Sequence, residues 1–145
     1  LRIGFSAAKG IAYGAKLPII SVPTYEALAH QLSKILKEGE KFIICNKVNK
    51  DEVYFAKFQI KGNSYIFVDD LAVRKNESFI DVVGRLPVFG NAAVLLSENL
   101  KFPVSPDPRF IAKWAIEYGE NSKTFDYDFL EPNYLKNFLI KENSK

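Results

Sequence analysis

The chain has 145 residues and a formal net charge of +3, with 48% apolar and 26% charged residues. These fractions are ordinary for a soluble globular protein, the length is enough for a real core, and so small a charge does not demand a nucleic-acid ligand. The one cysteine, Cys45, excludes a disulfide within the chain. There is no signal-peptide pattern and no apolar run near the roughly 20 residues of a membrane-spanning helix, so we expect a cytoplasmic protein without membrane contact.

The first fourteen residues predict a helix with very little side-chain bulk. Ile3, Ala7, Ile11 and Gly14 recur at intervals of three and four and therefore share one face. Each glycine costs about 0.5–1 kcal/mol relative to alanine inside a helix, so a helix that carries three of them is expected to pack closely against something. The pattern by itself favours packing on the chain's own sheet, and the alternative is a helix that also meets a partner protein.

The next segments predict a strand and a second helix. Residues 19–22 form a short β-branched run, typical of a strand that is buried on both faces. Thr24 is a suitable N-cap for a helix whose apolar stripe continues to Leu36 and which ends at Gly39. The first forty residues are therefore expected to form helix, strand, helix.

The pattern then changes to strands that are joined by short turns. The predicted strands cover residues 41–44, 53–60 and 65–68. Short turns between neighbouring strands predict an antiparallel meander. Further elements are expected as a short helix over 79–83 that Gly84 closes, a strand over 86–90, a helical segment over 91–99, and a helix over 109–118 that Gly119 ends. The tail from Glu120 is polar, but its apolar residues between Phe125 and Leu135 are expected to lay it across the body.

Three antiparallel strands followed by helix, strand, helix, helix is the order of an RNase-H-like unit. This order predicts an α/β fold in which antiparallel hairpins belong to a mixed sheet.

Several motifs resemble a known protein family. The motifs are LRIG at 1–4, AKGIA at 8–12, LPIISVPTYEALA at 17–29 and EPNYLK at 131–136. They resemble the TsaB family, also called YeaZ, which is the non-catalytic partner in bacterial tRNA threonylcarbamoyladenosine synthesis. Weaker similarity spans almost the whole chain, with one departure at Lys47, where the family has an acidic residue.

The resemblance implies the actin/Hsp70-like (ASKHA) fold, in which two RNase-H-like units lie side by side. Residues 1–36 would be the C-terminal portion of the first unit, and residues 37–145 would be the second unit with its C-terminal tail. The family's first strands and its Gly-rich turn precede the LRIG motif and are not in this sequence. We therefore expect a first helix that lacks a packing surface, either because the chain is a fragment or because a partner covers that face.

The resemblance also implies a function. It predicts a scaffold subunit that binds a TsaD-like catalytic subunit, works with a TsaE-like ATPase, and meets tRNA only through that complex. The predicted partner-binding residues are Arg2, Ile3, Ser6, Ala7, Lys9, Gly10 and Tyr13. The small residues permit close approach of a helix, while Arg2, Lys9 and Tyr13 would supply polar rim contacts and an aromatic anchor. Without its partner, such a surface could pair with itself and give a homodimer.

The sequence gives little support for catalysis, a metal or a cofactor. Catalytic triads need a histidine base, and the one histidine, His30, has no nucleophile pattern nearby, so a surface or edge position is expected. One histidine and one cysteine cannot form a zinc site. The pair Asp69-Asp70 is more typical of a solvated turn at a strand end than of a Mg²⁺ site.

Two alternative functions stay open. The turn around Gly90 lies at a strand–helix junction that approaches the nucleotide in kinases of the actin-like fold, so a small-molecule kinase or ATPase is possible, although a structural turn is favoured. A generic interaction domain unrelated to tRNA is the other alternative. Lys47, Lys50, Lys57 and Lys61 either protect a strand edge, which we favour, or contact tRNA.

Overall fold

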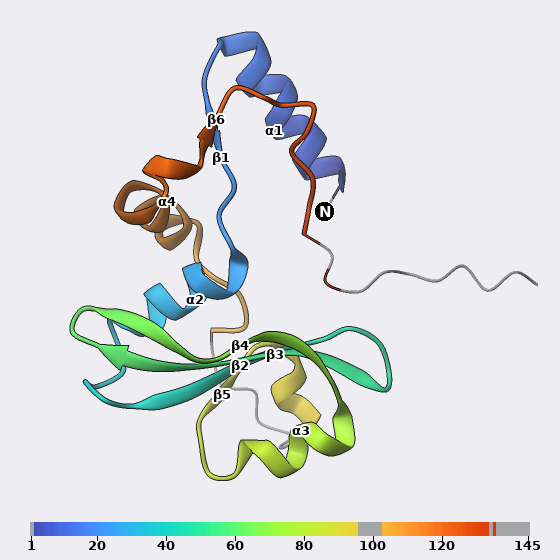
Figure 1. Ribbon diagram of the computed structural model, residues 1–145, viewed down its shortest axis with the longest axis vertical. Helices are drawn as coiled ribbons and strands as arrows, with labels where there is room; N and C mark the ends of the chain where they lie inside the picture. Colours follow the sequence, from blue (N-terminus) through green and yellow to red (C-terminus); the bar gives the residue numbers. More distant parts are fainter. Residues whose placement is uncertain (1, 96–102, 134, 136–145) are drawn as a thin grey trace, which may run out of the picture.

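The computed structural model describes residues 2–95, 103–133 and 135 (Figure 1). The elements in chain order are α1 (Arg2–Ala15), β1 (Ile19–Ile20), α2 (Thr24–Leu32), β2 (Lys41–Lys47), β3 (Glu52–Lys61), β4 (Ser64–Lys75), α3 (Asn76–Val83), β5 (Val88–Phe89), the 3₁₀ helix η1 (Asn91–Leu95), α4 (Pro108–Tyr118), the 3₁₀ helix η2 (Glu120–Ser122) and β6 (Lys123–Thr124). Within these residues, no helix combines the length and the apolar character that a membrane crossing requires.

Four strands form one mixed sheet in the order β4-β3-β2-β5. Antiparallel pairing joins β2 to β3 and β3 to β4, while β5 pairs with β2 in the parallel direction. The predicted antiparallel meander and the predicted α/β fold with a mixed sheet are therefore confirmed.

Strand β2 is buried on both faces. Phe42 and Ile44 pack in a cluster with side chains of α2, whereas Ile43 and Cys45 pack in a second cluster with side chains of α3 and η1. In Figure 1, α2 and α3 accordingly lie on opposite sides of the sheet. Alternate side chains of a strand point to opposite faces, so a strand covered on both sides needs an unbroken apolar run. Cys45 is buried, and burial raises the pKa of its thiol to about 12.

Strand β4 is longer than the sequence pattern predicted. It covers Ser64–Lys75 rather than residues 65–68, so Asp69 and Asp70 lie inside a strand and not in a turn. The error has a physical reason, because β4 is an edge strand with register irregularities, and its pattern does not alternate cleanly. Lys57 was expected at a strand edge, but β3 lies inside the sheet, and Lys57 is opposite Asp69.

The ends of two other elements also differ from expectation. Thr24 is the first residue of α2, and the N-cap is Pro23, which offers no side-chain hydrogen bond. The helix ends at Leu32, and turns follow it before Gly39. The segment predicted as helical over 91–99 begins with the 3₁₀ helix η1, and residues 96–99 lie outside the described residues.

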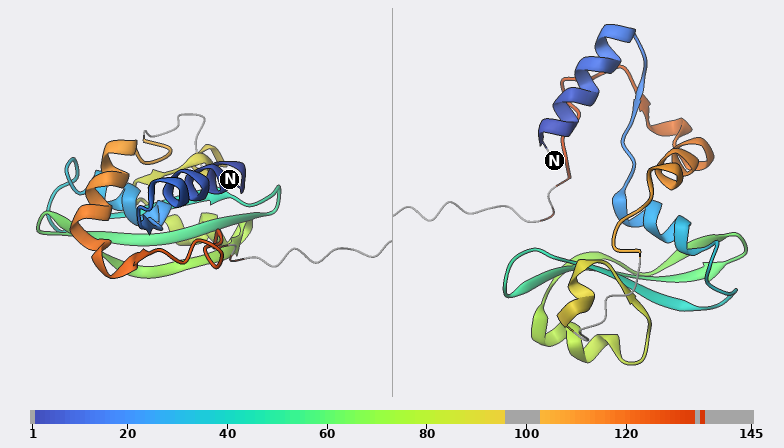
Figure 2. Two further views of the ribbon diagram at one scale, coloured as in Figure 1. Left: turned by 90° about the horizontal axis from the view of Figure 1, so that it is seen from above. Right: turned by 180° about the vertical axis from the view of Figure 1, so that it is seen from behind.

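The helix α1 stands away from the four-stranded sheet (Figures 1 and 2). The strand β1, expected to be buried on both faces, is only half-buried, because it pairs with β6 in a separate two-stranded sheet. The pairing brings the tail beside the start of the chain. Of the apolar tail residues, Phe125, Phe129 and Leu135 are exposed. The division of the chain into units at residue 36 stays a prediction.

The turn at Gly90 leaves no room for a side chain. Gly90 has φ +94°, and a Cβ built there would lie 2.1 Å from the carbonyl oxygen of Cys45. We expect Gly90→Ala to lower the free energy of unfolding by roughly 2–4 kcal/mol, from strain and overlap together, as measured by urea denaturation. The matched control is Gly62→Ala, where φ is +60° but the space is open, so the cost is only about 1–2 kcal/mol. Equal losses in both variants would contradict the steric argument.

Candidate functional site

The candidate partner-binding surface lies on α1, and the helix is exposed. The exposed fractions of Ile3, Ile11 and Tyr13 are 88%, 72% and 73%, and within α1 Ala12 is the one buried residue. A Cβ built on Gly4 or Gly10 would meet nothing within 4 Å. The expected packing of this helix on the chain's own sheet is therefore wrong, because the described chain places nothing against the Ile3 and Gly10 positions.

The structure divides the seven predicted interface residues between two neighbouring faces of α1. Residues 2, 6, 9 and 13 share one face, and residues 3, 7 and 10 share a face turned by about 100°. The first face borders the tail across a cavity of about 310 Å³. Its lining residues are Arg2, Phe5, Ser6, Lys9, Leu130, Glu131 and Pro132.

Tyr13 continues the tail-facing side, since its ring contacts that of Tyr127 edge to face, with centroids 5.8 Å apart. The Lys9 ammonium lies 5.6 Å from the centroid of the Phe5 ring. The second face carries Ile3, Ala7 and Gly10, which are all exposed. The structure thus places four of the predicted interface residues, Arg2, Ser6, Lys9 and Tyr13, on the side of α1 that faces the tail. The other three, Ile3, Ala7 and Gly10, lie on a face that the described chain leaves uncovered.

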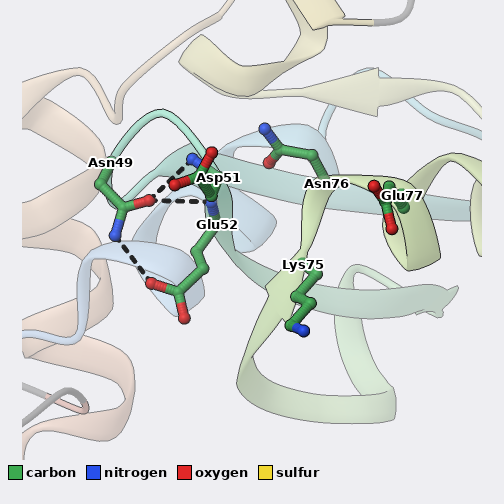
Figure 3. Close-up of a pocket in the computed structure, with 6 residues that line it drawn as sticks. All are labelled: Asn49, Asp51, Glu52, Lys75, Asn76 and Glu77. Carbon is green, nitrogen blue, oxygen red and sulfur yellow. Dashed lines mark hydrogen bonds between the residues drawn. The ribbon is translucent and has the colours of Figure 1, made fainter.

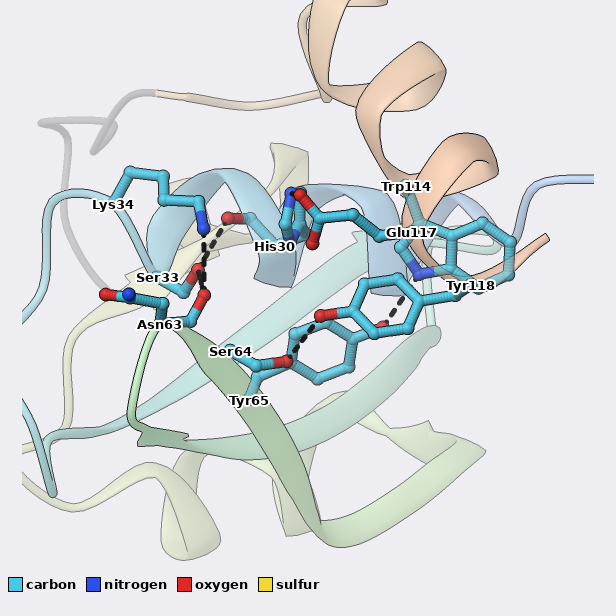
Figure 4. A network of polar contacts seen from close by, with 9 residues as sticks. All are labelled: His30, Ser33, Lys34, Asn63, Ser64, Tyr65, Trp114, Glu117 and Tyr118. Atoms are coloured by element: carbon cyan, nitrogen blue, oxygen red, sulfur yellow. Dashed lines mark hydrogen bonds and ion pairs between the residues drawn. The ribbon is translucent and has the colours of Figure 1, made fainter. Parts of the chain in front are cut away.

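The helices α2 and α4 meet around His30 (Figure 4). The sequence predicted a surface or edge histidine, and this prediction is wrong, because α4 covers the ring and leaves it 0% exposed. The aromatic rings of Phe110 and Tyr118 contact it edge to face, and its Nε2 lies 3.6 Å from Oε1 of Glu117. Neither ring nitrogen has a hydrogen-bond partner in the described part of the chain. No local sequence pattern could have shown that His30 is buried, because its burial depends on the packing of α4 against α2.

Polar contacts fasten α4 and α2 to the hairpin of β3 and β4 (Figure 4). Trp114 donates its indole N–H to the Tyr65 hydroxyl at 2.8 Å, and that hydroxyl donates to Oε2 of Glu26 at 2.9 Å. The Tyr118 and Ser64 hydroxyls are 2.8 Å apart. Burial is the main cause that raises the pKa of Tyr65, so this hydroxyl stays protonated and keeps its donor role.

A second, polar depression of about 700 Å³ lies where the β2–β3 turn meets the start of α3 (Figure 3). Asn49 Oδ1 accepts from the backbone N–H groups of Asp51 and Glu52, at 2.8 and 3.0 Å, and its amide donates to the Glu52 carboxylate. Asn76 joins the turn by donating its Nδ2 to the carbonyl of Lys50 at 2.8 Å. These bonds shape a turn, and among the described residues no group of His, Cys, Asp or Glu could hold a metal ion.

The Gly90 turn uses its polar groups internally. The backbone N–H of Asn91 donates to Oδ1 of Asn46 at 2.9 Å, and Oδ1 of Asn91 accepts from the N–H of Lys47 at 2.7 Å. Asn46 also donates its amide to the Tyr25 hydroxyl at 3.2 Å. A phosphate-binding loop instead points backbone N–H groups at the anion. The arrangement fits a structural turn.

Comparison with known proteins supports the fold. No protein-family model and no curated protein matches the sequence. YeaZ from Pseudomonas aeruginosa is similar in structure, with a TM-score of 0.69 and 18% identity, over 92% of this chain and 67% of that chain. A second structure, an uncharacterized protein with similarity to peptidase YeaZ from the same organism, has a TM-score of 0.67 and 18% identity over 93% of this chain and 67% of its own.

The chain is therefore an α/β protein with a mixed sheet, of the class that these two structures represent. Its particular fold is similar to that of YeaZ, also called TsaB, as the sequence motifs predicted. At 18% identity this similarity establishes the fold and leaves the function to other arguments.

The burial of His30 generates a prediction about pH. Burial, as the largest cause, lowers its pKa from 6.5, with smaller contributions from Lys34 and Lys113, while Glu117 opposes the shift. The unfolded chain therefore takes up a proton near pH 6.5 that the folded chain resists, so stability is full above that pH and falls below it. Urea denaturation between pH 8 and pH 5 should show this loss of stability. In His30→Gln the part of the loss that comes from the imidazole should be absent.

The carboxylate of Glu117, which lies beside His30, provides the control. Glu117→Gln removes the group that favours the imidazolium, so the loss of stability on acidification should become larger than in the unmodified protein. If His30→Gln and the unmodified protein lose stability in parallel, His30 is not the group responsible.

Proposed function

We propose that this chain is a TsaB-like, non-catalytic scaffold. It binds a TsaD-like catalytic subunit and so supports transfer of the threonylcarbamoyl group to the tRNA adenosine next to the anticodon, in a complex that also includes a TsaE-like ATPase. In this proposal the chain has the actin-like fold of its structural neighbours, acts in the cytoplasm and meets tRNA only through the complex. The observation that carries the proposal is the bare and exposed apolar face of α1.

The chemistry of that face suits a partner helix. Ile3 and Ile11 expose 88% and 72% of their surface, and between them Ala7 and Gly10 add almost no bulk. A helix without large side chains at its centre lets a second helix approach closely, and the two isoleucines at either side then supply the buried apolar area. Exposed apolar patches on soluble proteins mark such contacts.

When the partner is absent, a second copy of this chain can bind the same face and form a homodimer. A face of this kind can be self-complementary about a two-fold axis. Analytical ultracentrifugation with and without the TsaD-like subunit distinguishes the two, because under this proposal the partner displaces the second copy.

Two exposed isoleucines test the face directly. Ile11→Glu places a charge on the open face of α1, so the affinity for a TsaD-like subunit should fall by about tenfold or more, measured by isothermal titration calorimetry. Ile116→Glu is the matched control, because Ile116 on α4 is 80% exposed and lies outside the proposed surface. Both variants should keep the circular dichroism of the unmodified protein. Equal affinities would count against this face, and Ala7→Trp offers an independent steric check.

The kinase or ATPase alternative predicts a nucleotide near Gly90. Under the scaffold proposal, titration with ATP and Mg²⁺ gives no measurable heat, since the polar groups at that turn already have partners: the Asn91 N–H donates to Oδ1 of Asn46, and Oδ1 of Asn91 accepts from the Lys47 N–H. Tight binding with turnover would favour the enzyme. A generic interaction domain is distinguished by complementation, because only a TsaB-like protein restores growth in TsaB-depleted cells.

A further inference from the structure

The helix α1 is held against the rest of the protein by a segment that is remote in the sequence. We call residues 123–132 the strap. It follows η2, begins with β6, and runs back alongside α1 (Figures 1 and 2). The same views show α1 away from the sheet that contains the main core. The strap is therefore the part of the later chain that lies next to the first helix.

The strap is anchored before it reaches α1. Gly119 sits so close to β1 that a Cβ built on it would lie 2.7 Å from Cγ2 of Ile20 and 2.5 Å from the carbonyl oxygen of Ala115. Two residues of β6 then pair with β1, placing Lys123 opposite Ile20 and Thr124 opposite Ile19. The root of the strap is thus fixed to the segment that connects α1 to α2.

Tyr127 makes the contacts that reach α1. Its hydroxyl donates to the carbonyl of Leu17 at 2.9 Å, just after the helix, and its ring meets Tyr13 edge to face. Farther along, residues 130–132 border the N-terminal half of α1 across the cavity described above. The strap therefore contacts the C-terminal end of the helix and lies beside its N-terminal half, on the side of residues 2, 6, 9 and 13.

A helix of this composition needs such support. It has 14 residues, three of them glycines, and isolated helices of about this length are marginal in water even when rich in alanine. Exposure of nearly all its side chains means that burial against the core contributes little to its stability. An aromatic pair and a hydrogen bond at its C-terminal end restrict the freedom of the helix and of the linker that follows it.

We propose that the strap is a conformational device that keeps α1 helical and fixes its orientation, so that the side of Arg2, Ser6, Lys9 and Tyr13 faces the strap and the side of Ile3, Ala7 and Ile11 faces away from it. The inference stands apart from the proposed function, because it concerns the order of α1 and needs no partner. Tyr127 is the positioning residue in this device.

Hydrogen–deuterium exchange on the full chain tests the strap. Tyr127→Ala should raise the exchange rates of the α1 amides about fivefold or more, because it removes both the ring contact and the hydrogen bond, while the amides of β2 and β3 keep their protection. Phe129→Ala is the matched control, since Phe129 lies in the strap but is 85% exposed, and it should leave α1 unchanged.

A conservative variant covers the case in which Tyr127→Ala disturbs the whole fold. Tyr127→Phe keeps the ring and loses only the bond to Leu17, so it should raise exchange in α1 by a smaller factor and nowhere else. The proposal is overturned if α1 exchanges at the random-coil rate in the unmodified protein. It is also overturned if α1 keeps its protection in both Tyr127 variants.

Discussion

The burial of β2 on both faces is the constraint that determines where the surrounding helices and strands lie. Its run of apolar side chains is sandwiched between α2 on one side and α3 with η1 on the other. Because parallel pairing with β5 brings the two strands close, the chain after β5 must turn at Gly90 directly against the Cys45 carbonyl. The thiol of Cys45 is buried in this core and its pKa is raised, so it is not available as a reactive thiolate.

The helices α2 and α4 connect this core to α1 through a series of contacts. The ring of His30 and the bond from Trp114 to Tyr65 fasten α4 above the sheet. The chain leaving α4 turns at Gly119 against β1 and continues as the strap. The exposed helix is thus connected to the core by a series of contacts, each made by a different part of the sequence, and its outward face depends on all of them.

Local patterns predicted the elements well where one face of an element is buried in the core. The strands β2 and β3, α3 with its close at Gly84, and α4 with its end at Gly119 were confirmed. The errors occur where polar and apolar residues do not alternate regularly, or where a residue is covered by a segment that is distant in the sequence. The edge strand β4 was predicted too short, and His30 was placed at the surface, because polar sequence at an edge and helix packing leave no local signal.

The sequence alone was enough to predict the alternation of elements, the mixed α/β class, the similarity to YeaZ and the small side-chain bulk of the first helix, because these follow from periodicity, glycine content and short motifs. Which side of that helix faces the tail depends on the tertiary structure. The tail lies more than a hundred positions away along the chain, so its contact between Tyr127 and the end of α1 arises from the folded arrangement alone. The same reason explains why Arg2 and Lys9 lie beside the tail while Ile3 and Ala7 remain open.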